Sequence, residues 1–441
     1  MKVSSRYILL LVLAVLSLLA GFEVKAEAQS ESLIYSFTDG SNDGAVPANG
    51  LSFNNGSIFG VTNEGGGFNE DGVLFQLAPD GNDGWSESAV HVFEGGSDGA
   101  TPSPVIFDAA GNLYGEAVSF GAYGYGLVFE FSPSPGGWKM TILYNFKGGT
   151  DGGYPSGGLV FDAAGNLYGT TGGGGNLNLC QREPVNFGCG VIFKLSPGQN
   201  GTWSESVLYT FTGQQDGYGA EGGMTFDTQG NLYGTTFWYG FNSNGGYGVI
   251  FELSPKSNGE WQYSTLHHFA GGAGGEYPFS NLVLADGNIY GTTWEGGMMS
   301  ACNGNGCGLA YELSGATKKF SMLHVFSGEV DGGNLYSPLT LLNGALFGTT
   351  QIGGDLNFCK GTGGSQGDGC GVVYKLSAPT TAADGNGRFE VIHTFKNSNS
   401  ISNKDGDGPD GRMTFDNAGN LYGETRIGGT YGLGAIFEIT P

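Results

Sequence analysis

Basic residues are scarce in this chain of 441 residues. It carries 17 lysines and arginines against 41 aspartates and glutamates, which gives a net charge of −24 at pH 7. A field of this sign repels nucleic acid and anionic membrane surfaces, and it favours solubility. We therefore expect no nucleic-acid partner, and we expect a monomer.

Long apolar runs are absent after the N-terminus, so no membrane insertion is expected. The N-terminus itself has the features of a secretory signal. Two basic residues precede the apolar run Ile8–Leu19, and an A-x-A cleavage site ends at Ala28. We predict a signal peptide over residues 1–28 and one mature domain over residues 29–441, located outside the cell or in the periplasm.

Cysteine is sparse as well, with six residues in the whole chain. They fall in three local pairs: Cys180 and Cys189, Cys302 and Cys307, Cys359 and Cys370. Six cysteines allow fifteen pairings, and pairing within each local group is the simplest. Disulfides agree with export. A metal site is the alternative, but no pair has a histidine or a second pair at zinc spacing.

Histidine is rare, with five residues. Four of them lie two residues before a phenylalanine, where comparable segments have Tyr35, Tyr144 or Tyr209; they are His91, His267, His324 and His393. We interpret these four as substitutes for a packing tyrosine. Only His268 is outside the pattern, so a Ser-His-Asp or Cys-His site is not expected.

Glycine, in contrast, is abundant and periodic, with 86 residues. An apolar–aromatic–Gly motif recurs seven times and ends at Gly60, Gly115, Gly169, Gly234, Gly291, Gly348 and Gly423. The steps run from 54 to 75 residues. A period of this size indicates one supersecondary unit repeated around or along an axis.

The third repeat predicts four short strands separated by turns. They cover residues 159–161, 167–171, 191–195 and 203–211. In the last strand, alternation places Trp203, Val207, Tyr209 and Phe211 on one face. Four strands in about 55 residues match the size of a propeller blade.

The two ends of the chain complement each other. Leu33–Phe37 resembles the fourth strand of a repeat, and Ala435–Ile439 resembles the third strand of the last repeat. We predict an all-β, seven-bladed β-propeller of four-stranded blades, closed by the N-terminal strand, which completes the last blade. Closure removes exposed sheet edges. An open solenoid is the alternative.

These motifs resemble the choice-of-anchor tandem repeat family called GloVer repeats, found in exported bacterial proteins. The resemblance rests on Phe161–Thr171, Gly190–Pro197 and Leu208–Phe211, and it recurs over essentially the whole mature chain. The family implies a fold and an exported setting, and no reaction. Since the sequence ends at Pro441, directly after a repeat strand, we do not expect surface attachment by a C-terminal anchor.

Recurring aspartates are interpreted first as turn residues. One set begins Asp-x-x-Gly-Asn turns, and a second precedes glycine in the loops into the first strands. A ring of loop carboxylates could also hold Ca²⁺. The weak metal candidates are Asp405, Asp407 and Asp410, whose glycine and proline placement departs from an EF-hand. No other cofactor is expected.

Departures from the repeat are the strongest functional signal. Trp85, Trp138, Trp203 and Trp261 start fourth strands and belong to the scaffold, whereas Trp238 and Trp294 fall just after Thr-Thr pairs in adjacent repeats. With Tyr239, Phe241 and Glu295 they form the predicted ligand site. Exposed aromatics beside carboxylates and amides suit sugar rings.

The expected function is therefore that of a non-catalytic exported binding or scaffold protein. Its partner would be an extracellular carbohydrate or another exported protein. A hydrolase or polysaccharide lyase on the same face is the alternative, with carboxylates as acid and base. Its candidates break the repeat pattern: Glu64, Glu116, Glu295 and Glu424, with Arg426 against an acidic sugar.

Overall fold

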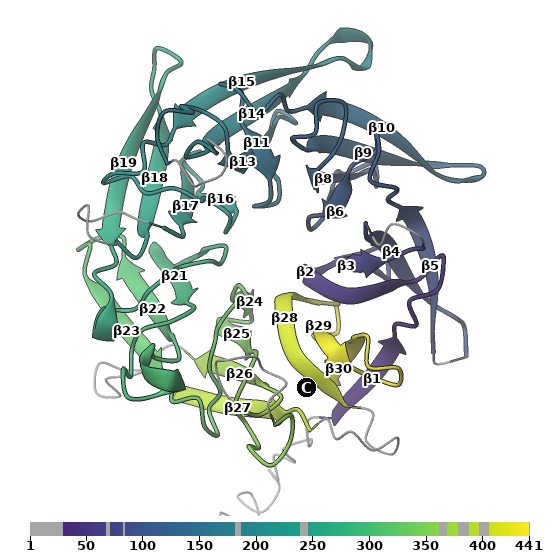
Figure 1. The fold of residues 1–441 in the computed structure, drawn as a ribbon, viewed down its shortest axis with the longest axis vertical. Coiled ribbons are helices and arrows are strands. Elements are labelled where there is room, and N and C mark those ends of the chain that lie inside the picture. The colour runs from purple at the N-terminus through teal and green to yellow at the C-terminus, as the bar shows by residue number, and fades with distance from the viewer. Residues whose placement is uncertain are drawn as a thin grey trace, which may run out of the picture.

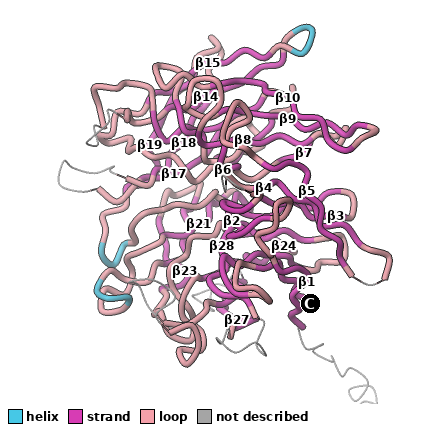
Figure 2. The backbone as a smooth tube through the Cα atoms, turned by 45° about the vertical axis from the view of Figure 1, so that its right-hand side comes forward, coloured by secondary structure: helices cyan, strands magenta, loops and turns pink. Residues whose placement is uncertain are grey.

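The computed structural model describes residues 30–67, 71–82, 84–180, 187–238, 246–360, 368–377, 388–396 and 405–440. It is an all-β molecule of small sheets in a propeller-like arrangement around a common centre (Figure 1). Figure 2 shows the same strands from an oblique direction, where loops and turns join them throughout. The three short 3₁₀ segments are η1 (Gln199–Gly201), η2 (Gly272–Gly274) and η3 (Cys302–Gly304).

Two five-stranded and three four-stranded sheets follow one another along the chain. The five-stranded sheets contain β6 (Ala100–Pro102), β7 (Ile106–Phe107), β8 (Leu113–Ser119), β9 (Leu127–Ser134) and β10 (Gly137–Asn145), then β11 (Gly153–Pro155), β12 (Val160–Phe161), β13 (Leu167–Gly173), β14 (Val191–Pro197) and β15 (Trp203–Thr210). The four-stranded sheets contain β16 (Met224–Phe226), β17 (Leu232–Thr236), β18 (Val249–Pro255) and β19 (Trp261–His268), then β20 (Val283–Ala285), β21 (Asn288–Thr293), β22 (Leu309–Ser314) and β23 (Phe320–Val325), then β24 (Thr340–Leu342), β25 (Ala345–Thr350), β26 (Val372–Ser377) and β27 (Arg388–Thr394).

The sixth sheet joins the two ends of the chain. Its order is β1-β30-β29-β28-β2-β3-β4-β5. Its strands are β1 (Ser30–Ser36), β30 (Ala435–Thr440), β29 (Leu421–Gly428), β28 (Gly406–Phe415), β2 (Gly44–Asn54), β3 (Ser57–Gly65), β4 (Val73–Pro79) and β5 (Trp85–Val92). β1 pairs antiparallel with β30, as the complementary ends predict. Only one parallel bridge, Gly50 to Arg412, links β2 to β28, so the sheet divides there into two groups of four strands.

The outermost strands carry a bulge that simple alternation did not predict. In β15 the register shifts between Val207 and Tyr209, so Leu208 is the extra residue. Val207 is 37% exposed, and Leu208 packs against the core instead. The same shift occurs in the other outer strands, where the extra residue is Ile34, Val90, Leu143, Leu266, Leu323 or Ile392. A bulge turns one additional apolar side chain inward, and it increases the local twist.

The cores lie between neighbouring sheets. One cluster joins Phe37 and Ile436 from the β1/β30 pair to Phe75 and Leu77 of β4, and the other clusters join consecutive repeats in the same way. The motif glycine makes this packing possible. A Cβ at Gly60 would lie less than 3.0 Å from the ring of Phe75, and the other six motif glycines face an equivalent ring. These glycines are required by close approach to a ring, because their φ angles are ordinary.

The predicted Asp-x-x-Gly-Asn turns are present. In the turn at Asp162, the carboxylate accepts hydrogen bonds from the amides of Ala164 and Asn166, from the Asn166 side chain and from the Tyr168 hydroxyl. These donors lower the pKa of Asp162, although burial acts in the opposite direction. Asp108, Asp227 and Asp416 repeat the arrangement. The turn interpretation therefore accounts for this set.

All three predicted local disulfides form. They join Cys180 to Cys189, Cys302 to Cys307, and Cys359 to Cys370. Each pair closes a loop just before a third strand. Within the described ranges, no helix has the length and apolar character needed to cross a membrane.

We predict that β1 is required for stability. A chain that begins at Thr38 leaves the β30 edge unpaired and removes the fully buried Phe37 ring. Phe37→Ala alone should cost about 3–5 kcal/mol, and the truncation should cost more. Thermal unfolding of both variants beside the mature chain tests this. An unchanged melting temperature of the truncated chain would show that β1 is dispensable.

Candidate functional site

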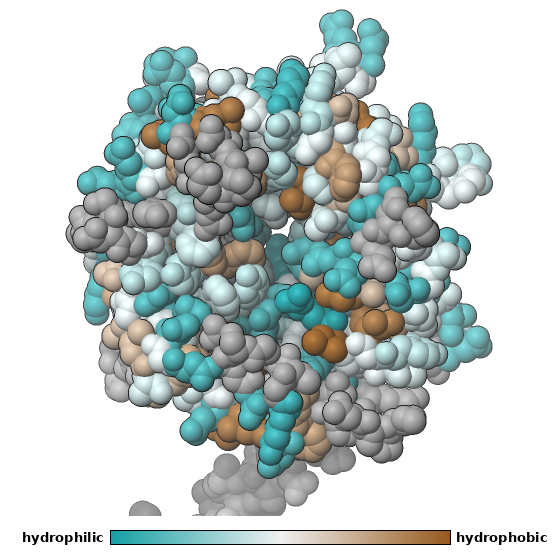
Figure 3. Space-filling view, in the orientation of Figure 1, coloured by the Kyte–Doolittle hydropathy of each residue, from teal (hydrophilic) through white to brown (hydrophobic). Residues whose placement is uncertain are grey.

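A cavity of about 320 Å³ lies at the centre of the molecule, and side chains or backbone from every repeat line it. Figure 3 shows this hollow in the middle of the face. Its charged and amide side chains include Asn63, Glu221, Asn281, Asp410 and Arg426. A cavity of this size suits a small polar molecule or one unit of a longer chain.

One position of the repeat contributes a residue to this lining in every repeat. It lies two or three residues before the first strand's apolar run, directly after a proline in five repeats, and it is occupied by Ala48, Ser103, Ser156, Glu221, Phe279, Tyr336 and Asp410. The backbone geometry is similar in each repeat, while the side chain changes from one repeat to the next. The cavity is therefore built from a single structural position that carries different chemistry around the centre.

Charged groups from several sheets converge on Tyr336. Burial raises the pKa of this phenol to about 12, with further increases from Asp410, Glu221 and Glu295, whereas Arg426 lowers it. Burial also raises the pKa of Asp410, against the opposing effect of Arg426. The Asp410 Oδ2 atom lies 3.9 Å from Arg426 Nε and accepts a hydrogen bond from Gln351. Hydrogen-bond donors and acceptors therefore face the same volume as an aromatic ring.

A smaller cavity of about 80 Å³ continues from the first and shares Asn49, Asn281 and Pro338 with it. It contains Arg412. The Arg412 residue is exposed to solvent, and partial desolvation by the neighbouring protein lowers the pKa of its guanidinium. No ion pair of Arg412 exists among the described residues. This second cavity therefore contains a positive charge.

Trp238 and Trp294 are half-buried in an aromatic cluster behind the cavity. The ring of Phe237 lies 4.5 Å from Trp238, 5.0 Å from Tyr277 and 6.0 Å from Trp294. Trp294 in turn lies 5.3 Å from Tyr336. Neither tryptophan lines the central cavity. The structure brings both predicted tryptophans into one cluster, and the cavity-lining Tyr336 and Phe279 contact this cluster through Trp294 and Phe237.

Trp238 and Trp294 do not occupy equivalent positions of the repeat, although both follow a Thr-Thr pair. Backbone bridges pair Trp238 with Tyr218 and Glu295 with Glu276, so Trp238 and Glu295 are equivalent. Trp294 therefore corresponds to Phe237. Glu295 is 7% exposed and accepts a hydrogen bond from Asn305. Tyr239 and Phe241 lie outside the described residues.

The weak metal candidates Asp405, Asp407 and Asp410 do not converge. No group of closely spaced metal-ligand atoms among the described residues contains all three. Asp410 lines the central cavity, Asp407 lies beside the Cys359–Cys370 disulfide, and Asp405 approaches His393 and Glu31. Asp407 and Asp410 lie three residues apart in the extended strand β28, which directs them to opposite faces, and Asp405 precedes this strand.

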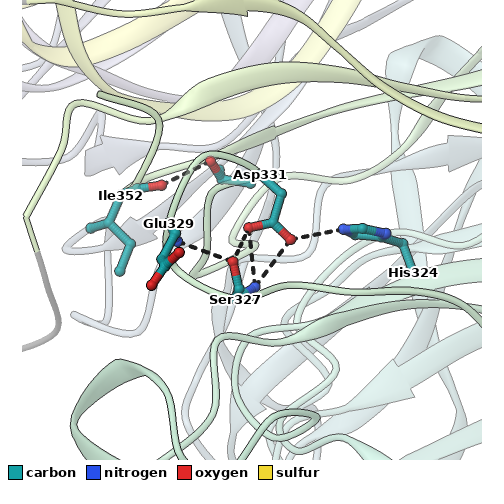
Figure 4. A network of polar contacts seen from close by, with 6 residues as sticks. His324, Ser327, Glu329, Asp331 and Ile352 are labelled. Carbon is teal, nitrogen blue, oxygen red and sulfur yellow. Dashed lines mark hydrogen bonds and ion pairs between the residues drawn. The ribbon is translucent and has the colours of Figure 1, made fainter. Parts of the chain in front are cut away.

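The recurring loop aspartates hold the outer strands. Asp331 accepts hydrogen bonds from the Ser327 amide and from His324 Nε2 at 2.9 Å (Figure 4). Asp98 binds His91 in the same way, and Asp151 and Asp216 accept from Tyr144 and Tyr209. The four patterned histidines also contact the phenylalanine two residues later. Both sets therefore contribute to the packing of the outer strands.

Two glutamates are buried where most repeats have threonine. Glu116 and Glu424 correspond to Thr170, which hydrogen-bonds the backbone of the next repeat. Glu116 accepts from the Gly158 amide at 2.9 Å, and Glu424 accepts from the Gly50 amide at 2.7 Å. Burial raises the pKa of Glu116 to about 8, although the Gly158 hydrogen bond opposes this shift. Burial, and then Asp410, raise the pKa of Glu424.

Comparison with protein families agrees with the sequence resemblance. The model of the Gloeobacter/Verrucomicrobia repeat matches residues 20–181 and 179–362. The chain belongs to this family. The two matches span most of the chain, so the Gloeobacter/Verrucomicrobia repeat accounts for its periodicity. No curated protein matches the sequence.

Several solved structures match at low similarity. An auxiliary nutrient binding protein from Bacteroides thetaiotaomicron has 10% identity and a TM-score of 0.47, over 93% of this chain and 76% of that one. A gluconolactonase from Xanthomonas campestris has 10% identity and a TM-score of 0.40, over 90% and 87%. A protein of unknown function from Dyadobacter fermentans has 10% identity and a TM-score of 0.43, over 94% and 98%. Similarity this low carries no argument about activity.

Tyr336 and Glu221 were missed by sequence reasoning. The predicted tryptophans follow Thr-Thr pairs, whereas the cavity is lined mainly from the loop before the first strand. A signal was present: this loop position holds Ala, Ser, Ser, Glu, Phe, Tyr and Asp in successive repeats. Variation at a position with fixed spacing marks a place that the scaffold does not constrain.

We predict that Glu116 makes stability fall as pH rises. Its folded pKa of about 8 exceeds the ordinary value of 4.5, so the folded state binds more protons between these values. Between pH 5 and pH 8, stability should decline by on the order of 3 kcal/mol through this group. Glu116→Gln keeps an acceptor for the Gly158 amide and should flatten the decline.

Urea unfolding at several pH values measures this effect, with the exposed Glu260→Gln as the matched control. An unchanged slope in Glu116→Gln would contradict the assignment.

Proposed function

We propose that this protein is an exported binding protein that takes a carbohydrate in its central cavity. The observation that carries the proposal is the lining position, which presents Glu221, Asp410, Tyr336 and Phe279 to one volume. Carboxylates accept hydrogen bonds from sugar hydroxyls, and aromatic rings pack against the apolar face of a sugar ring.

The aromatic cluster that packs against Tyr336 also supports a binding function. Trp294 packs edge-on against Tyr336 at 5.3 Å, and Phe279 lies 4.6 Å from Tyr336. These contacts restrict the orientation of the Tyr336 ring. A ring that is already ordered loses less conformational entropy when a ligand binds. Trp238 and Trp294 are therefore proposed as supports of the binding surface, with Glu295 as a nearby charge.

The charges of the cavity favour a ligand with an acidic group at one end. Arg412 lines the smaller cavity without an ion pair among the described residues, and Arg426 lines the larger one. In a chain of net charge −24, these are unusual concentrations of positive charge. An acidic sugar could place its carboxylate against Arg412 and its hydroxyls against Glu221 and Asp410.

The detailed fold that we propose is a closed, seven-bladed propeller. The seven motif copies and the pairing of β1 with β30 support it. The division of the eight-stranded sheet at the Gly50–Arg412 bridge supports it as well. The three disulfides support export, since such bonds persist in oxidising compartments. The proposed signal peptide over residues 1–28 lies outside the described residues.

A ligand panel tests the binding function. Isothermal titration with neutral and acidic oligosaccharides should reveal binding that Tyr336→Ala and Asp410→Asn each weaken roughly tenfold, because buried stacking and charged hydrogen bonds contribute about 1–3 kcal/mol each. Arg412→Gln should weaken acidic sugars more than neutral ones. Tyr431→Ala, a change at an exposed tyrosine outside the cavity, is the matched control.

Two results would contradict the proposal. Sugars that bind equally to the mature chain and to Tyr336→Ala would place the ligand elsewhere. Loss of binding in Trp238→Ala with no loss in Tyr336→Ala would return the site to the outer edge of the aromatic cluster.

A hydrolase or lyase is the second candidate, and the raised pKa values of Asp410 and Glu424 favour it. A raised pKa is the property that suits a carboxyl group to the role of general acid. Incubation with the polysaccharides that bind, followed by assay for new reducing ends, separates the two functions. Turnover that disappears in Asp410→Asn while binding persists would support the enzyme, and binding without new ends would support the binding protein.

A further inference from the structure

The outer strands of neighbouring repeats meet at a recurring set of three positions. The first is the His or Tyr of one outer strand, and the second is the carboxylate of the following loop. The third lies on the next outer strand, opposite an apolar residue of its neighbour, and it is occupied by Glu31, Glu87, Met140, Glu205, Tyr263, Phe320 and Phe389.

The nature of the third residue determines the chemistry of each junction. Where it is aromatic, it stacks on the first residue: Phe389 lies 3.8 Å from His324, and Phe320 lies 4.2 Å from His267. Where it is Glu87, the first residue is Tyr35. Burial, and then the Glu87 and Asp43 carboxylates, raise the pKa of this hydroxyl. Glu205 is likewise combined with Tyr144.

One junction differs from all the others in the described parts of the chain. It combines His393 of β27 with Asp405 of the loop into β28 and with Glu31 of β1. The potential ligand atoms of these three side chains all lie within 4.8 Å of one another. It is thus a histidine, rather than a tyrosine, that faces two carboxylates.

The histidine and the aspartate of this junction lie farther apart than at the other histidine–aspartate junctions. His393 Nε2 lies 3.8 Å from Asp405 Oδ2, whereas the corresponding distance is 2.9 Å at His91 and at His324. His393 Nε2 and Glu31 Oε1 are buried and make no hydrogen bond with the described residues. Burial, followed by the charge of Asp405, raises the pKa of Glu31 to about 7, while His393 lowers it.

We propose that Glu31, His393 and Asp405 bind a divalent transition-metal cation of the Zn²⁺ class. Imidazole nitrogen and carboxylate oxygen are ordinary zinc ligands, at about 2.0–2.2 Å from the ion. Two ligand atoms of a tetrahedral site are then about 3.3–3.5 Å apart. The distance of 3.8 Å is close to this spacing and too long for a hydrogen bond.

Asp405 is already held in place for this role. Its Oδ2 atom accepts a hydrogen bond from the Lys396 amide at 2.8 Å, and Oδ1 accepts from the Gly406 amide at 2.9 Å. Backbone donors of this kind orient a ligating carboxylate. The His393 and Asp405 side chains are 18% and 15% exposed, so an ion can enter from the surface and keep a water ligand.

A cation at this place would join three separate segments of the chain. These are β1 near the start, β27, and the loop into β28. Because the folded chain gathers these ligands and the unfolded chain does not, binding would stabilise the fold in proportion to ion concentration. The function would be to fasten the N-terminal strand to its neighbouring sheet, independently of the sugar site.

Repeat equivalence supplies a variant that should fold. His393→Tyr reproduces the arrangement of Tyr35 with Asp43 and Glu87, so it should preserve packing and remove the nitrogen ligand. His324→Tyr makes the same change at a junction where Phe389 replaces the second carboxylate. It is the matched control. Glu31→Gln removes one oxygen ligand.

The experiment uses the untagged mature chain, stripped with EDTA. Zinc chloride should raise its melting temperature, and titration calorimetry should give one high-affinity site per chain. His393→Tyr and Glu31→Gln should weaken zinc roughly tenfold or more. His324→Tyr should bind zinc as the mature chain does.

Absence of zinc binding by the mature chain would overturn the proposal, and so would equal zinc affinity in His393→Tyr. Glycan binding, measured in parallel, does not depend on this site.

Discussion

An aromatic ring resting on a glycine backbone is the contact on which the rest of the molecule depends. The seven motif glycines lie on second strands, and each faces a ring from the third strand of its own repeat. Any side chain at these glycines would occupy the space of the ring. The contact sets the distance between neighbouring sheets, and the fully buried phenylalanines at the outer strands pack around it. Sheets built in this way repeat with nearly identical geometry, which is why their loops converge on one centre.

Because the glycine–ring contact recurs with a regular spacing, much of the fold could be predicted from the sequence. The period, the strands, the Asp turns and the local disulfides are all local patterns. The outer-strand bulges were missed because alternation assumes one residue per step. The extra residue, such as Leu208, is revealed only by its pairing with the neighbouring strand. The offset between Trp238 and Trp294 has a similar origin, since both follow a Thr-Thr pair but at different distances.

The candidate site was predicted less well, for a physical reason. Trp238 and Trp294 were recognised as departures, and they lie in one aromatic cluster. Which ring reaches the cavity depends on the loop before the first strand, and that placement is a tertiary property. Tyr336 and Glu221 come from this loop in different repeats. Convergence of residues so distant in sequence follows from the arrangement of sheets around a centre, and single residues do not reveal it.

Acidic groups have different environments at the outer strands and near the centre of the molecule. At the outer strands, the loop aspartates are neutralised by hydrogen bonds from amides, imidazoles and phenols, so they stabilise the fold. Toward the centre, Asp410 and Glu424 are buried with fewer donors, and their pKa values rise. The loop aspartates therefore differ from Asp410 and Glu424 in how fully hydrogen bonds stabilise the carboxylate charge.

The cavity lining has a consequence for how new specificities arise. Each repeat contributes one side chain at one loop position, and none of these side chains is needed to seat the ring on its glycine. Substitution of one of these residues changes which ligand the central cavity recognises, while the sheets stay packed. The architecture therefore allows ligand specificity to diverge one repeat at a time, while the packing of the sheets remains the same.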